Sequence, residues 1–526
     1  MFWRCGSLSS KKTLKMSSPT YTLSKSTFVR GCKCLKSLYL YKFHYDLRDE
    51  VSEQQQSLFD QGNEVGMLAR SLFPGGKDAT VSPAHDYTAS VQHTQQFLET
   101  GCKTVYEAGF MFNNVYAAAD ILLIRPNGWY LYEVKSSTSV KEYHILDAAL
   151  QYYILKNLGY PVKQVNIVCI NNQYVRHCTI EPEKLFDIHD ITTQAGDLQD
   201  YVEDQLEVMQ QMLKIRMEPQ CRLGPQCSEF YPCDFHGHCW KKFNEVKYPV
   251  TAISKIGDKL WELVNKNIYC QSQIPSEYYF RLTPLQRQQI VCTLEHKSSA
   301  PNIKEIRKFL KNVSSPVSFL DFETIATAIP LFDGTRPYQQ VPFQFSLHCD
   351  DGSGQHCHYE YLGDGKTDPR PELIKQLLTS IPRKGSILVY YMPFEQTRLQ
   401  ELAESFPQYR KQLLSICERL VDLIIPFRNR YIYHHKMNGS ASIKSVLPAL
   451  FPELDYSKLN ISDGGIASLA YLNLSRLKDK KQIASIREDL LEYCKRDTDA
   501  MVKLYGYLNN LTCSCAKVIP MWQMAH

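Results

Sequence analysis

Two strand-rich segments that lie far apart in the sequence constrain the fold of this chain most strongly. The first, residues 104–135, contains VYEAGFMF, VYAAADILLI and WYLYEVKSS, and Pro126-Asn127-Gly128 between the last two strands indicates a hairpin. The second is made of VSFLDFET (317–324), PFQFSLH (342–348), SILVYY (386–391) and VDLIIPF (421–427). Because 526 residues are too many for one compact core, we expect the two segments to lie in separate domains.

Helical patterns surround both segments. Apolar residues repeat at helical spacing from Ile145 to Leu155, before a further strand, VNIVCI (165–170). Residues 196–216 form a charged amphipathic helix, and residues 485–510 are also predicted to be helical. Prolines interrupt residues 250–312, which predict a connector of short helices. The mixture of helices and strands favours an α/β fold.

Composition limits the classes of protein to which the chain can belong. Its 44% hydrophobic and 22% charged residues are ordinary for a globular protein in water. No run of about eighteen apolar residues occurs, so we expect no membrane span and no membrane partner. The net charge of +5 is compatible with a nucleic-acid partner but does not require one.

The first 45 residues contain Arg and Lys but neither Asp nor Glu. This composition is similar to that of a mitochondrial presequence; the alternative, which we favour, is an upstream start codon before Met16. We therefore expect a disordered basic extension over residues 1–19 and a cytoplasmic protein. Thiols are reduced in the cytoplasm, so the 18 cysteines favour ligation of a metal or cluster over disulfides.

The first candidate site consists of Asp120, Glu133 and Lys135. Pairing of the two strands can bring the carboxylates together, and Lys135 shares a strand face with Glu133 because side chains alternate along a strand. Two carboxylates suit Mg²⁺ or Mn²⁺, and a lysine can orient a water and neutralise phosphate charge. The alternative is a surface hairpin with solvated side chains.

The second candidate site is centred on Asp321 and Glu323, which period two places on one strand face. Glu395 follows the strand SILVYY, and Tyr493 and Asp497 share a helix face because they are four residues apart. Carboxylates on one strand face can both bind metal ions. In the alternative, the strand is buried and the acids are ordinary surface residues. We expect Asp422 in VDLIIPF to be a strand-edge residue that does not belong to the site.

A cysteine segment separates the two sites. Cys221, Cys227, Cys233 and Cys239 recur at equal spacing, with His236 and His238 among them. Zinc sites typically use closer CxxC pairs. A Cys/His zinc site, a cluster and free buried thiols all remain open at this point.

The first half of the chain resembles the RecB-like branch of the PD-(D/E)xK nucleases, whose core is followed by a helix with Gln and Tyr, here Gln151-Tyr152-Tyr153. The resemblance implies that Asp120 and Glu133 bind metal, that Lys135 is catalytic and that Gln151 supports the DNA side. The family's metal-binding His, after a glycine on an early helix, has no counterpart in GNEVG (62–66), where Glu64 is a candidate substitute.

Some of these nucleases hold a [4Fe–4S] cluster with one cysteine before the nuclease core and three after it. The resemblance implies the same layout here, with Cys34, Cys227, Cys233 and Cys239 as ligands, Cys32 or Cys221 as replacements for one of them, and Zn²⁺ as the alternative cofactor. The role that we expect for the cluster is structural.

The second half resembles the RNase H-like DEDD 3′→5′ exonucleases of the tyrosine subtype. The resemblance implies that Asp321, Glu323, Glu395 and Asp497 bind Mg²⁺ or Mn²⁺ and that Tyr493 helps to place the water. Two positions depart from the family pattern: Glu395 stands where Asp is usual, and Tyr391 stands where Asn is frequent. In NGSASIKSVLPALFPELDY (438–456), Ser442 and Lys444 are candidate phosphate contacts, and the alternative is a lysine on a solvated turn.

The whole arrangement resembles a mostly bacterial family that joins these two halves. The expected domains are a PD-(D/E)xK restriction-endonuclease-like domain with the cysteine cluster (20–242), a helical connector (243–314), an RNase H-like domain (315–512) and a tail (513–526). We expect a metal-dependent nuclease that acts on single-stranded DNA or DNA ends, or on RNA, in repair, recombination or defence, with a helicase or repair protein as a candidate partner. The alternative is a nucleic-acid-binding protein with one or both sites inactive.

Overall fold

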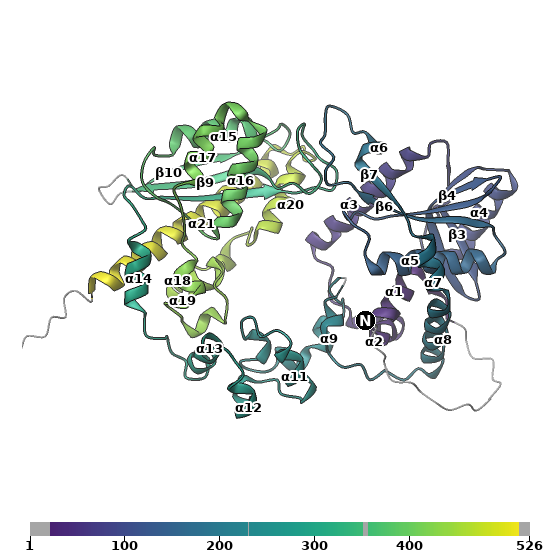
Figure 1. Ribbon diagram of the computed structural model, residues 1–526, viewed down its shortest axis with the longest axis horizontal. Coiled ribbons are helices and arrows are strands. Elements are labelled where there is room, and N and C mark those ends of the chain that lie inside the picture. Colours follow the sequence, from purple (N-terminus) through teal and green to yellow (C-terminus); the bar gives the residue numbers. More distant parts are fainter. Residues whose placement is uncertain (1–20, 230, 351–355, 515–526) are drawn as a thin grey trace, which may run out of the picture.

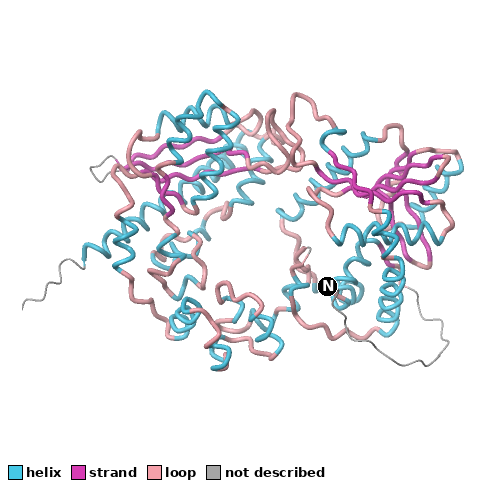
Figure 2. The backbone as a smooth tube through the Cα atoms, in the orientation of Figure 1, coloured by secondary structure: helices cyan, strands magenta, loops and turns pink. Residues whose placement is uncertain are grey.

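The computed structural model describes residues 21–229, 231–350 and 356–514, so the expected basic extension and most of the expected tail lie outside the described residues. The described chain is mixed α/β, with two mixed sheets and helices around each (Figure 1). The two sheets belong to separate lobes, and a mainly helical segment joins these lobes on one side of the molecule (Figure 2). Among the described helices, none combines the length and apolar character that a membrane span requires.

The N-terminal sheet has seven strands, with β2-β3-β4-β5-β6-β7 in order and β1 beside β4. Strands β3, β4 and β5 are antiparallel neighbours, whereas β5 and β6 are parallel because α5 crosses between them. The strands are β1 (Leu23–Ser24), β2 (Lys77–Asp78), β3 (Thr104–Phe112), β4 (Val115–Arg125), β5 (Gly128–Val134), β6 (Val162–Ile170) and β7 (Phe186–Asp190).

Helices cover both faces of this sheet. One face packs mainly against α1, α2, α5 and α8, and α3 packs on the other. Ser24 caps α1 with a capping box. The helices are α1 (Lys25–Lys33), α2 (Leu35–Phe43), α3 (Glu53–Ala69), α4 (Tyr87–Glu99), α5 (Glu142–Asn157), α6 (Pro182–Leu185), α7 (Thr192–Asp197) and α8 (Gln199–Ile215).

Short helices follow the N-terminal sheet along the chain, from α9 to α14. The sequence breaks them at prolines such as Pro275, which precedes α12, and Pro284, which begins α13. They are α9 (His236–Cys239), α10 (Lys241–Asn244), α11 (Lys259–Asn265), α12 (Ser276–Tyr279), α13 (Pro284–Leu294) and α14 (Ile303–Leu310).

The C-terminal sheet has five strands in the order β10-β9-β8-β11-β12. Strands β8, β9 and β10 are antiparallel neighbours, and β11 and β12 run parallel to β8. The strands are β8 (Ser318–Ile325), β9 (Val341–Asp350), β10 (His356–Leu362), β11 (Ile387–Val389) and β12 (Leu420–Asp422).

Two hydrophobic clusters lie on opposite faces of the C-terminal sheet. Leu320 and Phe322 face α15, α16 and α17, while Phe319 faces α19, α20 and α21. Alternation along β8 therefore directs Asp321 and Glu323 toward α21. The helices are α15 (Arg370–Ser380), α16 (Met392–Ser405), α17 (Arg410–Cys417), α18 (Ile425–Arg428), α19 (Ile443–Leu450), α20 (Gly464–Leu474) and α21 (Lys480–Ser514).

The two lobes also contact each other directly. Arg176 of the N-terminal lobe donates to the carbonyls of Pro330 and Leu331, each at 2.8 Å. Gln54 on α3 donates to Asp463, the N-cap of α20, at 2.8 Å. These contacts join the lobes on the side away from the connector (Figure 1).

Candidate functional site

The residues predicted for the second site surround one cavity of about 290 Å³ in the C-terminal lobe. Strand β8 supplies Asp321 and Glu323, and α21 supplies Tyr493 and Asp497. The fifth predicted residue, Glu395, comes from the first turn of α16. Elements that are far apart in the chain thus bring all five side chains together.

Three of these acids form a compact cluster. Asp321, Glu323 and Asp497 each offer a carboxylate oxygen within 4.8 Å of the others, and within the described part of the chain no other group of three Asp, Glu, His or Cys ligand atoms is this close. Oxygen ligands in such a group suit a hard cation such as Mg²⁺ or Mn²⁺.

Mutual repulsion acts on these buried acids. Burial and the charge of Asp497 raise the pKa of Asp321 well above its usual range, and burial and the charge of Asp321 do the same for Glu323. Burial raises the pKa of Asp497 to about 6, although a hydrogen bond from Tyr456 acts in the opposite direction. A bound cation would relieve this repulsion.

Glu395 lies at the edge of the three-acid cluster. It is 2% exposed, and its Oε2 atom has no hydrogen-bond partner. Burial, then the charges of Asp321 and Glu323, raise its pKa well above the usual range. A buried carboxylate oxygen without a donor fits a cation-binding role, because leaving such an atom unpaired is costly.

Two residues not assigned to the site by its motifs also hold it together. Tyr456 donates to Asp497 Oδ1 at 2.6 Å and thereby orients that carboxylate. Lys444, a candidate phosphate contact, lines the cavity and donates to the Tyr493 hydroxyl at 2.9 Å. Ser442, the other candidate, is the N-cap of α19 and pairs with the Ser445 hydroxyl at 3.0 Å.

Asp422 is the last residue of β12, the edge strand of the C-terminal sheet, and it is buried. Its Oδ1 accepts the backbone N–H groups of Tyr391 at 3.0 Å and Ile424 at 3.2 Å. These bonds tie the ends of β11 and β12 together, and Asp422 does not line the acidic cavity.

The first predicted site lies on the N-terminal sheet. Asp120 on β4 and Glu133 on β5 lie next to the paired residues Ile121 and Tyr132, and Glu107 on β3 lies between Tyr106 and Ala108, which pair with Ile121 and Ala119 of β4. Glu107 has a φ of 53°, a left-handed conformation that is strained for a side chain with a Cβ. Sequence patterns did not identify Glu107, which extends the acidic pair into a row of three carboxylates across adjacent strands.

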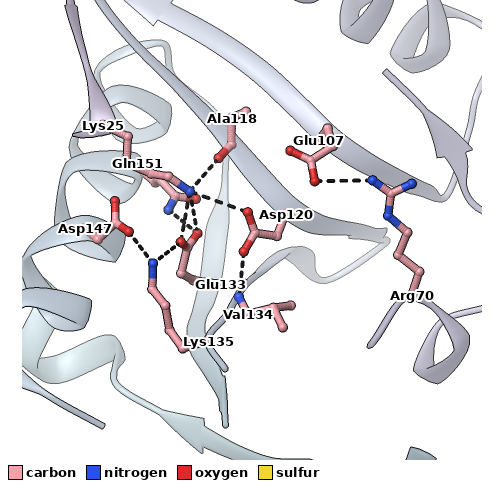
Figure 3. Close-up of polar contacts among 10 residues, drawn as sticks. All are labelled: Lys25, Arg70, Glu107, Ala118, Asp120, Glu133, Val134, Lys135, Asp147 and Gln151. Atoms are coloured by element: carbon pink, nitrogen blue, oxygen red, sulfur yellow. Dashed lines mark hydrogen bonds and ion pairs between the residues drawn. The ribbon is translucent and has the colours of Figure 1, made fainter. Parts of the chain in front are cut away.

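Two lysines contact one end of this row, and Arg70 contacts Glu107 at the other end (Figure 3). Lys25, the first residue of α1, donates to both Glu133 oxygens at 2.9 Å and lies 3.5 Å from Asp120 Oδ1. Lys135 donates to Glu133 Oε1 at 2.6 Å and to Asp147 Oδ2 at 2.5 Å. The predicted Asp120, Glu133 and Lys135 are therefore together, and two residues absent from the prediction, Lys25 and Asp147, join them.

Further contacts fix the ends of the N-terminal cluster. Gln151 on α5 donates to Glu133 Oε2 at 2.6 Å, and the Val134 N–H donates to Asp120 Oδ2 at 2.7 Å. Glu64, the candidate substitute for histidine, instead pairs with Arg476 of the C-terminal lobe at 3.2 Å. The side chain of Glu64 is 56% exposed, so the structure gives it no role in this cluster.

Charge strongly perturbs these groups. Burial lowers the pKa of Lys25, but Asp120, Glu133 and Asp147 outweigh that effect and raise it well above the usual range. Burial would raise the pKa of Glu133, but Lys135 and Lys25 hold it well below its usual range. Burial and the charge of Glu133 raise the pKa of Asp120 to about 7. Glu133 is thus the charged centre of the cluster.

The four predicted cluster ligands, Cys34, Cys227, Cys233 and Cys239, line one small cavity together with Cys221. Cys34 lies at the junction of α1 and α2, so the first helices meet the later cysteine segment here. A hydrogen bond with Cys221, then burial, raises the pKa of Cys34. Of the two proposed replacements, Cys221 therefore lies at the site.

Ion pairs between Asp234 and two arginines hold the cysteine segment in place. Asp234, next to Cys233, accepts hydrogen bonds from Arg30 of α1 at 2.5 and 3.0 Å and from Arg48 at 2.7 Å. Burial raises the pKa of Asp234, but both arginines outweigh that effect and lower it. These ion pairs tie α1, which ends beside Cys34, to the segment that contains Cys233.

Comparisons with known proteins match only part of the chain. A model described as "Domain of unknown function (DUF2779)" matches residues 318–442, from β8 to the start of α19. This region contains Asp321, Glu323 and Glu395 but neither Tyr493 nor Asp497.

Three curated relatives are described only as uncharacterised proteins. They are the MG366 homolog of Mycoplasma pneumoniae (28% identical, 36% of this chain), MG366 of Mycoplasma genitalium (25%, 37%) and UU173 of Ureaplasma parvum (29%, 39%). In each comparison the match spans 32% of the relative's length.

Proposed function

We propose that this protein is a metal-dependent nuclease whose phosphodiester cleavage takes place at the cavity of the C-terminal lobe. The observation that carries the proposal is the approach of Asp321, Glu323 and Asp497 to within 4.8 Å of one another beside that cavity. Buried like charges this close are costly without cations, which makes a stabilising role alone a poor account of them.

The side chains present fit divalent cations. Asp321, Glu323 and Asp497 would hold Mg²⁺ or Mn²⁺, and the unpartnered Oε2 of Glu395 is available to a second ion. When bound, such ions supply Lewis-acid activation of water and neutralise charge on the phosphate. The order of strands in the mixed C-terminal sheet is consistent with the proposed RNase H-like architecture of this lobe.

Residues around the acids would position the reacting groups. Tyr493 points its hydroxyl toward the cluster, where it can hold a water by a hydrogen bond, and Lys444 donates to that hydroxyl. Lys444 is the only lysine or arginine among the residues that line the described cavity, so we assign to it the neutralisation of the scissile phosphate. Tyr456 keeps Asp497 in place.

The substrate that we propose is DNA, single-stranded or at an end, with RNA as the alternative. The net charge of +5 is compatible with a polyanion once the acidic sites are neutralised by cations. The resemblance to DEDD exonucleases supports stepwise cleavage from a strand end. Repair, recombination or defence is the corresponding process.

For the N-terminal lobe we propose a PD-(D/E)xK-like domain that contacts nucleic acid. Asp120, Glu133, Lys135 and Gln151 meet as that architecture requires, which supports the proposal. Whether this lobe also cleaves depends on Lys25, which occupies the space beside both carboxylates.

The cysteine cavity is proposed to hold a [4Fe–4S] cluster that fastens α1 and α2 to the connector. Tetrahedral zinc would require thiolate sulfurs about 3.8 Å apart. Four cysteines that line one cavity suit the four-thiolate ligation of an iron–sulfur cluster, and Zn²⁺ bound by the same thiols is the alternative. Absorption near ~400 nm with bound iron would distinguish the cluster from zinc.

A cleavage assay with matched variants tests the proposed function. Full-length protein is incubated with end-labelled single-stranded DNA, duplex DNA and RNA in Mg²⁺ or Mn²⁺. We expect Asp321→Asn to reduce cleavage by about 100-fold or more, since it removes a charge that the reaction requires. Asp499→Asn, on α21 but paired with His348 at 3.1 Å and outside the cavity, serves as the control. Equal cleavage by the Asp321→Asn protein and the unmodified protein would reject the proposal.

A further inference from the structure

Lys25 lies where a cation would have to bind in the N-terminal cluster. Its ammonium group is 2.9 Å from both oxygens of Glu133, 3.5 Å from Asp120 Oδ1 and 3.3 Å from the carbonyl oxygen of Ala118 (Figure 3). Four oxygen atoms of two neighbouring strands thus surround one positive charge. Asp120 and Glu133 are the residues that the PD-(D/E)xK resemblance assigns to a divalent metal.

The hydrogen-bonding capacity of Glu133 is already used. An ionised carboxylate has about four lone-pair sites. Oε1 accepts from Lys25 and Lys135, and Oε2 accepts from Lys25 and Gln151. Because protein donors take all of these sites, a metal ion could bind Glu133 only if it displaced one of them.

The local charge is also nearly balanced. Arg70 divides its charge between Asp78 at 2.6 Å and Glu107 at 3.3 Å. The carboxylates of Asp120, Glu133 and Asp147 face the cations of Lys25 and Lys135. Adding a divalent cation while Lys25 stays would give this group of side chains an excess of positive charge. The side chains of the N-terminal cluster therefore do not fit a resident Mg²⁺ or Mn²⁺.

The backbone fixes Lys25 at this place. Strand β1 pairs in parallel with β4, with Leu23 opposite Val115 and Ser24 opposite Tyr116, and α1 begins at the next residue. Ser24 is held by its capping box with Thr27. The side chain of Lys25 is 23% exposed, and its reach toward Asp120 follows from the β1–β4 register.

We propose that the ammonium group of Lys25 replaces the divalent cation in the N-terminal carboxylate cluster and closes that cluster to metal. The N-terminal lobe then binds nucleic acid without cleaving it, and cleavage belongs to the C-terminal cavity alone. The lysine also ties α1, which contains Cys32 and ends beside Cys34, to the sheet.

The test measures Mn²⁺ binding rather than cleavage. Full-length protein with Asp321→Asn and Asp497→Asn serves as the background, so that the C-terminal cluster does not contribute to the count. Electron paramagnetic resonance of free Mn²⁺ gives the number of bound ions. We compare this background with versions that add Lys25→Met, Lys135→Met, or Lys25→Met together with Asp120→Asn; circular dichroism checks the fold of each.

We expect no Asp120-dependent Mn²⁺ site in the background protein. Lys25→Met should create one, at least about 10-fold tighter than any site in the background, and Asp120→Asn should remove it again. Lys135→Met, which also frees an acceptor site on Glu133, should create none because Lys25 remains. This pattern would attribute the exclusion of metal to Lys25 rather than to positive charge in general.

Two results would overturn the proposal. One is an Mn²⁺ ion that binds the background protein and is lost when Asp120→Asn is added to that background. The other is a folded Lys25→Met protein that gains no site. If Lys25→Met does not fold, Lys25→Gln replaces it. The C-terminal residues are disabled throughout, so failure of this proposal is distinguishable from failure of the proposed cleavage.

Discussion

The two acidic clusters contain the same kinds of residues but differ in what surrounds them. In the N-terminal cluster, protein donors take every acceptor site of Glu133. In the C-terminal cluster, Glu395 Oε2 has no hydrogen-bond partner, burial and the charge of Asp497 raise the pKa of Asp321, and burial raises the pKa of Asp497. Carboxylates on neighbouring elements are therefore not sufficient evidence of a metal site, because the nearby amines decide whether their charge is already neutralised.

Removing the central charge of the N-terminal cluster should have the largest effect on stability. Glu133→Gln leaves Lys25 and Lys135 without their shared carboxylate, and breaking a buried ion pair in this way costs about 3 kcal/mol. Urea unfolding followed by circular dichroism measures the loss. Asp321→Asn in a chelator provides the comparison, since it removes repulsion and should not destabilise the protein. Equal destabilisation by Glu133→Gln and Asp321→Asn would contradict the proposed difference in charge balance between the two clusters.

Added metal should stabilise the C-terminal lobe. At a Mn²⁺ concentration about 100 times its Kd, binding to the folded state contributes about 2.7 kcal/mol and raises the melting temperature. Calorimetry should show this increase for the unmodified protein and for Asp120→Asn, but not for the protein with Asp321→Asn and Asp497→Asn. If the increase in melting temperature depends on Asp120 instead, the metal binds the N-terminal cluster, and the proposed location of the metal is wrong.

The pH dependence of stability should reveal Asp497. Its pKa is raised from 3.8 to about 6 by burial, so the folded state binds the proton more tightly than the unfolded chain. The stabilising contribution is complete below pH 3.8 and is lost as the pH rises through 6.

In a chelator, the stability of Asp497→Asn relative to the unmodified protein should therefore increase by about 2 kcal/mol between about pH 4 and pH 8. The difference between the two proteins isolates this group from carboxyls whose pKa is lowered, such as Asp234. Denaturant titrations at several pH values provide the measurement, and a difference that does not change with pH would contradict the assigned shift.

The smallest expected effect concerns Tyr493. Tyr493→Phe removes one hydroxyl beside the acids, which should lower the rate of cleavage by about 10-fold, in proportion to one hydrogen bond near charged groups. Tyr505→Phe on the same helix, whose ring contacts Phe319, controls for changes in α21. Single-turnover kinetics measures both. A rate for Tyr493→Phe equal to that of the control would remove Tyr493 from the proposed chemistry.

Sequence patterns predicted the parts of the sites that local geometry determines. Asp321 and Glu323 follow from alternation along β8, and Tyr493 and Asp497 from helical spacing on α21. Lys25 escaped prediction because its position depends on the pairing of β1 with β4, about a hundred residues away in the chain. No local motif in the sequence encodes that contact.

The fold shows the same division between local and long-range effects. The predicted strand SILVYY is shorter in the structure because Tyr391 has a φ of 82° and is the N-cap of α16. The predicted strand VDLIIPF ends at Asp422, whose side chain accepts the Ile424 N–H before Pro426 enters α18. Strands β2, β7 and β10 were not predicted, because their short or polar segments gain strand structure only from neighbouring strands.

The location of bound metal tests the central contrast most directly. Crystals of the unmodified protein soaked in Mn²⁺ and measured for anomalous scattering would locate each ion. We predict anomalous peaks among Asp321, Glu323 and Asp497, with Lys25 still in contact with Glu133. An anomalous peak between Asp120 and Glu133 would contradict this prediction. So would the lack of any peak beside Asp321 at saturating Mn²⁺.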